Sequence, residues 1–197
     1  MIQDSDIDAQ QVREHQLKRY EALCALGAFD GRSVLEIGCG SGDFYRYLRQ
    51  SGARPLYTGL DLSPLAVAEC RERYREEPDC RFELGEALHY QPSQPFDFVV
   101  ASAGFGFAAP NAAGLLAPAL TRLFSWCTRG VAATFPSLRA PARGPHLARI
   151  DPAFAVKAAL RLTPVVRLAH DYLPVDFTVY LYRTPAWQPA TSRGATS

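Results

Sequence analysis

Residues 34–43 constrain the fold of this chain more than any other segment, because an apolar strand pattern runs directly into three closely spaced glycines. Glycine has no Cβ, so Gly38, Gly40 and Gly42 allow a sharp turn and the close approach of a ligand to the backbone. A loop of this kind follows the first strand of nucleotide-binding α/β folds. The dinucleotide fingerprint G-x-G-x-x-G would need glycine where this chain has Asp43. The loop therefore favours a nucleoside without phosphates over a pyrophosphate.

Two carboxylates accompany this loop. Glu36 precedes the first glycine, where a carboxylate repels phosphate but can pair with an ammonium group. Asp61 ends the next apolar run, about 20 residues beyond the loop, and a carboxylate there accepts hydrogen bonds from ribose hydroxyls in this architecture. The alternative is that Asp61 caps the following helix, but Ser63, with Pro64 at the first helical position, already meets that need. We therefore predict that Asp61 binds ribose.

Helical and strand patterns alternate along the chain, which is typical of a parallel sheet with helices on both faces. We expect an α/β fold whose mostly parallel sheet ends in an antiparallel C-terminal hairpin at one edge. The expected helices cover residues 6–26, 44–50, 63–74, 112–127 and 152–162. The seven expected strands cover residues 33–38, 55–60, 81–84, 96–102, 130–135, 164–170 and 177–183. The core-facing residues of the first helix should be Ile7, Leu17, Tyr20, Leu23 and Cys24.

Composition is that of a globular chain, with 197 residues, 48% hydrophobic and 21% charged, which excludes disordered and collagen-like classes. We expect one domain over residues 1–183 and a disordered tail over residues 184–197. Five widely spaced cysteines without metal-ligand spacing predict reduced thiols and no metal site. The acidic start of the chain is unlike a signal peptide, and Pro110 and Pro118 interrupt the uncharged stretch 98–121. These features predict a cytoplasmic protein without a membrane span.

Charge is distributed unevenly along the sequence. Up to Asp97 there are 17 acidic and 11 basic residues, and beyond it there are 3 acidic and 10 basic residues. The arginines of the basic half are scattered, so an anionic small substrate or a solvated surface fits them and nucleic acid is not the expected partner.

Several segments resemble the motifs of the class I S-adenosylmethionine-dependent methyltransferases, over a stretch from about residue 33 to residue 183. The third of these motifs is the weakest match, because the commoner residue at its acidic position is aspartate. The last two expected strands are similar to those of a bacterial subgroup of small methyltransferases. The matching segments are the E-x-G-x-G-x-G pattern from Glu36, the acidic Asp61, residues 84–87 with Glu86 and Ala87, and residues 96–102.

The resemblance implies a Rossmann-like fold of the class I methyltransferase type and S-adenosyl-L-methionine as the cofactor. It places most of the cofactor contacts on the glycine loop and on the ends of the following strands. The N-terminal helix is a candidate lid that would bring an arginine to the methionyl carboxylate. The predicted cofactor-binding residues are Arg19, Glu36, Gly38, Cys39, Gly40, Gly42, Asp61, Leu62, Glu86, Ala87 and Ser102.

The implied reaction is transfer of a methyl group to an oxygen or nitrogen of a small-molecule acceptor. Such a transfer is an in-line displacement that depends mainly on placing the acceptor atom about 3 Å from the methyl carbon. A general base helps when the acceptor must lose a proton. Catalytic candidates at the expected hairpin turn are His170, Asp171 and Tyr172. Candidates for contact with the acceptor are Tyr20, Phe105, His146 and Asp176.

Two other functions stay open at this point, since one fold can host different reactions. The same cofactor site could serve an enzyme that cleaves or cyclises the aminocarboxypropyl arm, forming azetidine-2-carboxylate and releasing methylthioadenosine. It could also belong to a protein that binds S-adenosylmethionine without turnover. In each case we expect a monomer or a homodimer.

Overall fold

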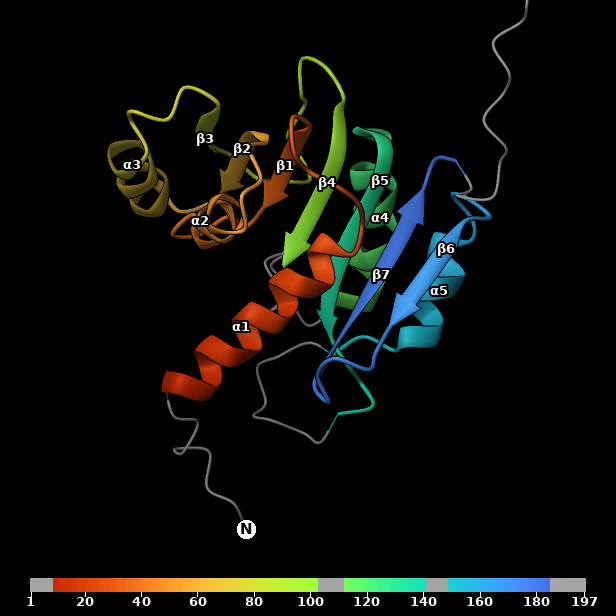
Figure 1. Cartoon of the computed structure of the whole chain (residues 1–197). Helices are drawn as coiled ribbons and strands as arrows, with labels where there is room; N and C mark the ends of the chain where they lie inside the picture. The colour runs from red at the N-terminus through yellow and green to blue at the C-terminus, as the bar shows by residue number, and fades with distance from the viewer. Residues whose placement is uncertain (1–8, 103–111, 141–148, 185–197) are drawn as a thin grey trace, which may run out of the picture.

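Strands and helices alternate along the chain, as the sequence pattern predicts (Figure 1). The computed structural model describes residues 9–102, 112–140 and 149–184. The helices are α1 (Ala9–Cys24), α2 (Asp43–Gln50), α3 (Pro64–Arg73), α4 (Ala112–Ser125) and α5 (Pro152–Ala159). The strands are β1 (Ser33–Ile37), β2 (Leu56–Asp61), β3 (Cys80–Leu84), β4 (Phe96–Ser102), β5 (Cys127–Pro136), β6 (Val166–Ala169) and β7 (Asp176–Tyr182).

The seven strands form one sheet in the order β3-β2-β1-β4-β5-β7-β6. The first five run parallel to one another, and β7 is antiparallel to both β5 and β6. The predicted mostly parallel sheet with an antiparallel C-terminal hairpin at one edge is therefore confirmed. The strand order reverses between β1 and β4, and in open α/β sheets the crevice at the carboxyl ends of two such strands is where ligands bind.

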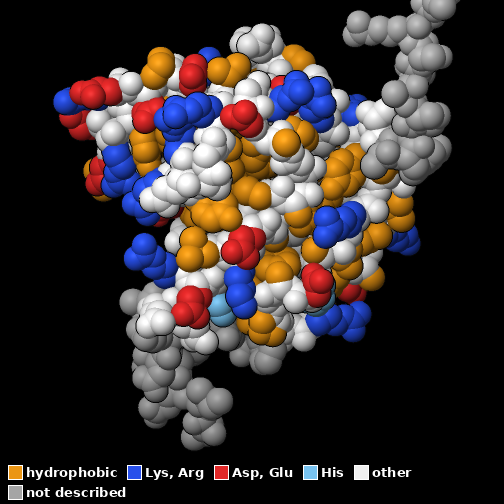
Figure 2. Space-filling view, in the orientation of Figure 1, with side chains coloured by type: hydrophobic (Ala, Val, Ile, Leu, Met, Phe, Trp, Pro, Cys, Tyr) orange, Lys and Arg blue, Asp and Glu red, His pale blue; other side chains and the backbone are white. Residues whose placement is uncertain are grey.

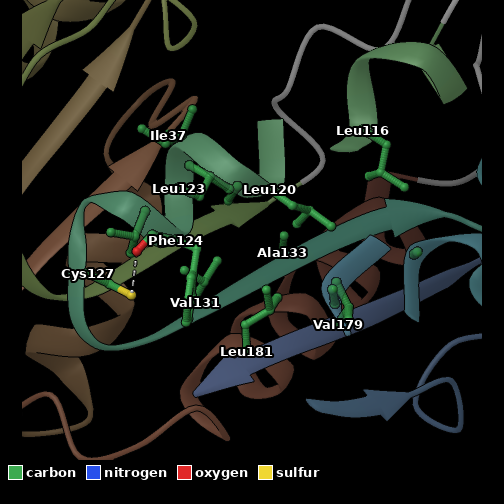
Figure 3. Packing of buried hydrophobic residues seen from close by; sticks show 14 of the residues in the cluster. Ile37, Leu116, Leu120, Leu123, Phe124, Cys127, Val131, Ala133, Val179 and Leu181 are labelled. Carbon is green, nitrogen blue, oxygen red and sulfur yellow. Dashed lines mark hydrogen bonds between the residues drawn. The ribbon is translucent and has the colours of Figure 1, made fainter. Parts of the chain in front are cut away.

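The helices cover both faces of the sheet and bury one apolar cluster on each. On the face of α4 and α5, Leu116, Leu120 and Leu123 of α4 are buried against β5 and β7 (Figure 3). Complete burial of a leucine side chain stabilises the fold by about 2 kcal/mol. On the other face, α1, α2 and α3 cover a second buried cluster that includes many aromatic rings. This second face also carries the polar residues described below.

Two helix starts show how the sequence sets local structure. Ser63 caps α3, because its Oγ accepts a hydrogen bond from the backbone N–H of Ala66 at 3.3 Å and Pro64 fills the first helical position. Asp151 caps α5 in the same way through the N–H of Ala153 at 3.0 Å. The predicted cap at Ser63 is confirmed.

One prediction about local structure was wrong. Leu17 is 41% exposed, because it faces a groove between α1 and α2 whose walls include the charged Arg13, Asp43 and Arg46. Pro118 lies inside α4, within the helix that the sequence predicts over residues 112–127. No helix among the described residues is long and apolar enough to cross a membrane.

Candidate functional site

The glycine loop between β1 and α2 follows from the backbone conformation that its sequence permits. Gly38, Gly40 and Gly42 all have positive φ, at 72°, 49° and 73°, a region that other residues rarely adopt. A Cβ on Gly42 would lie 2.8 Å from the ring of Tyr74, whereas a Cβ on Gly40 would meet no protein atom within 4 Å. Gly42 is therefore required by packing, and Gly40 borders free space that a ligand can occupy.

Asp61, at the end of β2, connects that strand to the glycine loop. Its Oδ2 accepts a hydrogen bond from the N–H of Gly40 at 2.8 Å, and its Oδ1 accepts one from the N–H of Ser63 at 2.9 Å. Because each carboxylate oxygen can accept more than one hydrogen bond, both keep capacity for a ligand hydroxyl. The carboxylate is half-buried and lines a cavity, as a ribose ligand would require.

That cavity, which we call the nucleoside cavity, has a volume of about 230 Å³ and lies beside the carboxyl ends of β1 and β2. The predicted pair Glu86 and Ala87 forms part of its wall. The Glu86 carboxylate lies 2.7 Å from Nδ1 of His89. Most of the remaining wall is apolar, which suits a flat heterocyclic ring, and consists of Ile37, Gly38, Leu60, Leu62, Gly85, Leu88 and Leu115.

A second cavity of about 260 Å³, which we call the α1 cavity, lies under the first helix and shares Gly38 with the nucleoside cavity. The sheet contributes Glu36 and Ser102, and α1 contributes Arg19 and Tyr20. The loop residues Cys39, Gly40 and Ser41 complete the wall nearest the nucleoside cavity. The two cavities together follow the edge where β1, β2 and β4 end.

Glu36 is the most unusual group of the α1 cavity. Its side chain is buried and accepts a hydrogen bond from the Tyr57 hydroxyl, and among the described residues no ion pair with Glu36 is found. The pKa of Glu36 is raised to about 8, mainly by burial and in smaller part by the nearby carboxylates of Asp43 and Asp61, while the Tyr57 hydrogen bond opposes the shift. The α1 cavity thus holds a buried carboxyl group that pairs with no cationic side chain among the described residues.

Comparison with known proteins agrees with this geometry. Residues 34–124 match a family model described as a methyltransferase domain. The chain also superimposes on the crystal structure of magnesium protoporphyrin IX methyltransferase from Synechocystis PCC 6803 with bound S-adenosylhomocysteine, with a TM-score of 0.69 and 18% identity over 92% of this chain and 90% of that chain. The chain thus has the fold of this solved methyltransferase, and its residues 34–124 resemble a methyltransferase domain.

Other relatives fit the same assignment. A methyltransferase from Mesorhizobium loti has a TM-score of 0.62 at 17% identity, over 86% of this chain and 100% of that one. Trans-aconitate 2-methyltransferase from Klebsiella pneumoniae (strain 342) is 33% identical over 78 residues, which are 40% of this chain and 30% of that protein. The protein of the same name from Escherichia coli O139:H28 is 36% identical over 70 residues, 36% of this chain and 27% of that one. The matched stretch thus spans under a third of the length of these two relatives.

Arg19 and Asp176, predicted as separate contacts to cofactor and acceptor, form an ion pair with each other. Nε of Arg19 lies 2.7 Å from Oδ2 of Asp176, and the Asp176 side chain is only 3% exposed. Because α1 and β7 are far apart in the sequence, this pair fastens the first helix to the antiparallel strand at the carboxyl edge of the sheet. The guanidinium of Arg19 therefore faces a neutralising carboxylate as well as the α1 cavity.

Hydroxyl groups continue from the α1 cavity across the sheet. Ser102 of β4 lies opposite Thr134 of β5, and Thr134 lies opposite Thr178 of β7. The Oγ1 atoms of the two threonines are 2.9 Å apart, and the hydroxyl of Tyr172 is 2.8 Å from that of Thr178. Burial raises the pKa of Tyr172 to about 12. Tyr172 therefore keeps its proton at neutral pH and is a hydrogen-bonding group in this series, and its catalytic role stays a prediction.

The other catalytic and acceptor-site predictions are untested. His170 packs edge-on against the ring of Phe177, with 5.9 Å between ring centroids, and Asp171 is exposed. Neither lines the nucleoside cavity or the α1 cavity. Phe105 and His146 lie outside the described residues. No group of metal-ligating residues is found among those that the structure describes.

Sequence reasoning missed two residues of the site. Tyr57, which binds Glu36, shares a face of β2 with Gly59 and Asp61, so the two-residue period of the strand was a usable signal. Gln16 lines the α1 cavity and donates a hydrogen bond to the Tyr20 hydroxyl at 2.6 Å. Nothing in the sequence distinguished Gln16 from other polar residues of α1.

Proposed function

We propose that this chain binds S-adenosylmethionine along the ends of β1, β2 and β4 and transfers its methyl group to an oxygen or nitrogen of a small-molecule acceptor. The observation that carries the proposal is the pair of cavities that share Gly38, with Asp61 at the end of β2 in the first and the buried Glu36 in the second. A nucleoside linked to an amino-acid arm needs two adjoining compartments of this kind. The match of residues 34–124 to a methyltransferase-domain model supports the same assignment.

The nucleoside cavity fits the adenosine half. Asp61 would accept hydrogen bonds from the ribose hydroxyls with the oxygen capacity that Gly40 and Ser63 leave free. The apolar walls of Ile37 and Leu115 would contact the adenine ring. Hydrogen bonds from neutral hydroxyls to a carboxylate contribute about 1.5–3 kcal/mol each, so Asp61 would be the main polar determinant of affinity.

The α1 cavity fits the methionyl half. Glu36 is a buried carboxyl group that lacks a cationic partner among the described residues, and an ammonium group would supply one. Arg19 would face the carboxylate of the amino-acid arm from α1 while it stays paired with Asp176. Opposite charges would thus meet at both ends of the arm, which fixes its direction in the cavity.

The chemistry supplied by the bound cofactor is an electrophilic methyl group on a sulfonium. The work of the protein is to orient this group and the acceptor, because alignment of two reactants supplies a large part of the acceleration in such transfers. The glycine loop and Asp61 would fix the cofactor from one side. Tyr20 and Ser102 border the α1 cavity on the other side, and an aromatic ring near a sulfonium stabilises its charge by about 0.5–2 kcal/mol.

We propose that the acceptor is small and anionic. Two relatives are named trans-aconitate 2-methyltransferase, which supports this substrate class. The excess of basic residues beyond Asp97 agrees with it. On the face shown in Figure 2, basic and acidic side chains are interspersed rather than gathered into one patch.

We further propose one domain over residues 1–183, with α1 as its lid, acting in the cytoplasm as a monomer or homodimer.

Mass spectrometry of the purified chain tests the reaction directly. We expect S-adenosylhomocysteine when S-adenosylmethionine and a cell extract are both present, and none with the cofactor alone. Methylthioadenosine formed from the cofactor alone would contradict methyl transfer and establish cleavage or cyclisation of the aminocarboxypropyl arm. Tight binding without any by-product, whatever the extract, would establish a binding protein instead.

A further inference from the structure

Three consecutive carbonyl groups of the glycine loop are bound by side chains from a single helical segment. Sγ of Cys70 donates to the Gly40 carbonyl at 3.2 Å. Nη1 of Arg73 donates to the next carbonyl, that of Ser41, at 2.8 Å, and the hydroxyl of Tyr74 donates to that of Gly42 at 3.1 Å. Residues spaced by three and four lie on one face of a helix, so α3 and its C-cap residue present all three donors together.

The loop is held from the opposite side by β2. The Leu60 carbonyl accepts hydrogen bonds from the N–H groups of Gly38 and Cys39 at 2.8 and 3.2 Å, and Asp61 accepts that of Gly40. The amide groups of Gly38, Cys39 and Gly40 are therefore bound by β2, while α3 binds the three carbonyl groups that follow. The last of these, that of Gly42, also accepts the N–H of Arg46 at 3.2 Å. A trans peptide holds its C=O and N–H groups in opposite directions, so fixing the carbonyls also fixes the directions of the amides that follow them.

Glycines make this double attachment necessary. A glycine at positive φ has many other conformations open to it, and it loses more conformational entropy on ordering than any other residue. Gly40 and Gly42 both have positive φ in the loop. Without external hydrogen bonds, the loop would sample conformations in which the two cavities are not aligned.

We propose that Cys70, Arg73 and Tyr74 are positioning residues that keep the glycine loop in the conformation that binds the cofactor. The inference rests on the proposed function, because it assigns these side chains to affinity for S-adenosylmethionine. None of the three lines either cavity, so they act through the loop. Burial also raises the pKa of the Cys70 thiol to about 11, which keeps it protonated and able to donate.

Tyr74→Phe is the sharpest single variant, because it removes only the donor. The ring of Tyr74 stacks on Phe82 at 5.4 Å and packs edge-on against Tyr45 at 5.2 Å, and phenylalanine keeps both contacts. One hydrogen bond of this kind corresponds to a loss of about threefold to tenfold in affinity. We expect Tyr74→Phe and Arg73→Gln each to weaken binding by that factor, and the double variant to weaken it by about 30-fold.

Cysteine and arginine offer matched controls. Cys70→Ser keeps a donor at the same place and should bind within about twofold of wild type, whereas Cys70→Ala should lose about threefold. Arg75→Gln removes the same charge as Arg73→Gln two residues further along, where the side chain pairs only with Glu72 and Glu76 among the described residues. We expect Arg75→Gln to bind like wild type, which separates a loss of charge from a loss of the loop contact.

Calorimetric titration of the full chain with S-adenosylmethionine measures each dissociation constant, and a thermal melt without ligand reports stability. The inference predicts weaker binding by the loop variants with melting temperatures close to wild type. Variants that bind like wild type, or that lose stability while their dissociation constants at 10 °C stay the same, would overturn it. Wild-type protein that binds no S-adenosylmethionine would overturn the proposed function and this inference together.

Discussion

The two sides of the α1 cavity are held together in different ways. On the side of the glycine loop, backbone N–H and C=O groups make most of the contacts, with Asp61 and the α3 side chains as partners. On the side of β7, side chains bind other side chains, in the Arg19–Asp176 ion pair and the hydroxyl series from Thr134 to Tyr172. Cofactor affinity should therefore depend mainly on the first side, to which the second adds only Arg19, and turnover and stability should depend mainly on the second.

The largest effect is expected for Asp61→Ala, which removes the proposed ribose acceptor and the hydrogen bonds that Asp61 accepts from the N–H groups of Gly40 and Ser63. Loss of about 3 kcal/mol corresponds to a decrease in affinity for S-adenosylmethionine of about 100-fold. Titration calorimetry measures the dissociation constants of the variant and of wild type. The matched control is Asp30→Ala, which also removes a carboxylate bound to a backbone N–H, that of Arg54, ahead of the amino end of β1. Equal affinity of Asp61→Ala and wild type would refute the assignment of ribose to Asp61.

Glu36→Gln should have the next largest effect and a dependence on pH. The pKa of Glu36 is raised to about 8 from an ordinary 4.5, so the folded chain holds a proton between these values that the unfolded chain has released. Its stability therefore falls as pH rises from about 4.5 to 8. Glutamine does not ionise, so the variant avoids the free-energy cost of a buried carboxylate. Without ligand it should be more stable than wild type at pH 8.5 but not at pH 4.5.

Cofactor binding should respond in the opposite direction. The carboxylate that Glu36→Gln removes is the proposed partner of the ammonium group of the methionyl arm. We therefore expect the variant to have a dissociation constant about tenfold higher than that of wild type at pH 8. Wild-type affinity should rise from pH 6.5 to 8 as Glu36 loses its proton. Urea denaturation and titration at both pH values measure the two effects. If stability and affinity depended on pH in the same way in wild type and variant, Glu36 would not be the group responsible for either dependence.

Arg19 and Asp176 test the other side of the comparison. Arg19→Met would leave the buried Asp176 carboxylate without its cation and should lower the free energy of unfolding by about 3 kcal/mol. Asp176→Asn leaves an arginine that is 25% exposed and can reach water, so its cost should be about 1 kcal/mol. Arg19→Met also removes the proposed partner of the methionyl carboxylate and should weaken affinity for S-adenosylmethionine by about tenfold, whereas Asp176→Asn should keep it within threefold. Wild-type affinity in Arg19→Met would contradict the proposed contact of Arg19 with the cofactor.

The smallest effect is expected for Tyr172→Phe, which removes one hydroxyl from the series with Thr178. Loss of a single hydrogen bond should cost about 1 kcal/mol in the free energy of unfolding. Since the pKa of Tyr172 is about 12, wild-type turnover should show no inflection near pH 10 from this group. Steady-state kinetics should give an unchanged KM for S-adenosylmethionine, and a large increase in that KM would break the distinction between the two sides.

The sequence predicted the glycine-loop side well, because its determinants are local. The positive φ angles of Gly38 and Gly42, the cap at Ser63 and the position of Asp61 all follow from residue types over about 30 positions. The parallel sheet and the C-terminal hairpin followed from alternating patterns in the same way. What these signals lacked was packing, which is why Leu17 was wrongly expected in the core.

The β7 side could not be predicted in the same way, because its contacts join distant segments. Arg19 and Asp176 were both named as site residues, but they lie 157 residues apart in the sequence. Their pairing depends on where α1 crosses the sheet. The contact between Thr134 and Thr178 depends on the register of β5 and β7. Strand register is set by tertiary packing and turn geometry, and no short motif records it.

Calorimetric titration of the full chain with S-adenosylmethionine at pH 8 tests the central claim most directly. We expect one binding site per chain with a dissociation constant between about 1 μM and 1 mM, the range usual for enzyme substrates. The Asp61→Ala variant should lose this binding. A folded wild-type protein that gives no binding signal at millimolar cofactor would contradict the claim, as would equal binding by the Asp61→Ala variant.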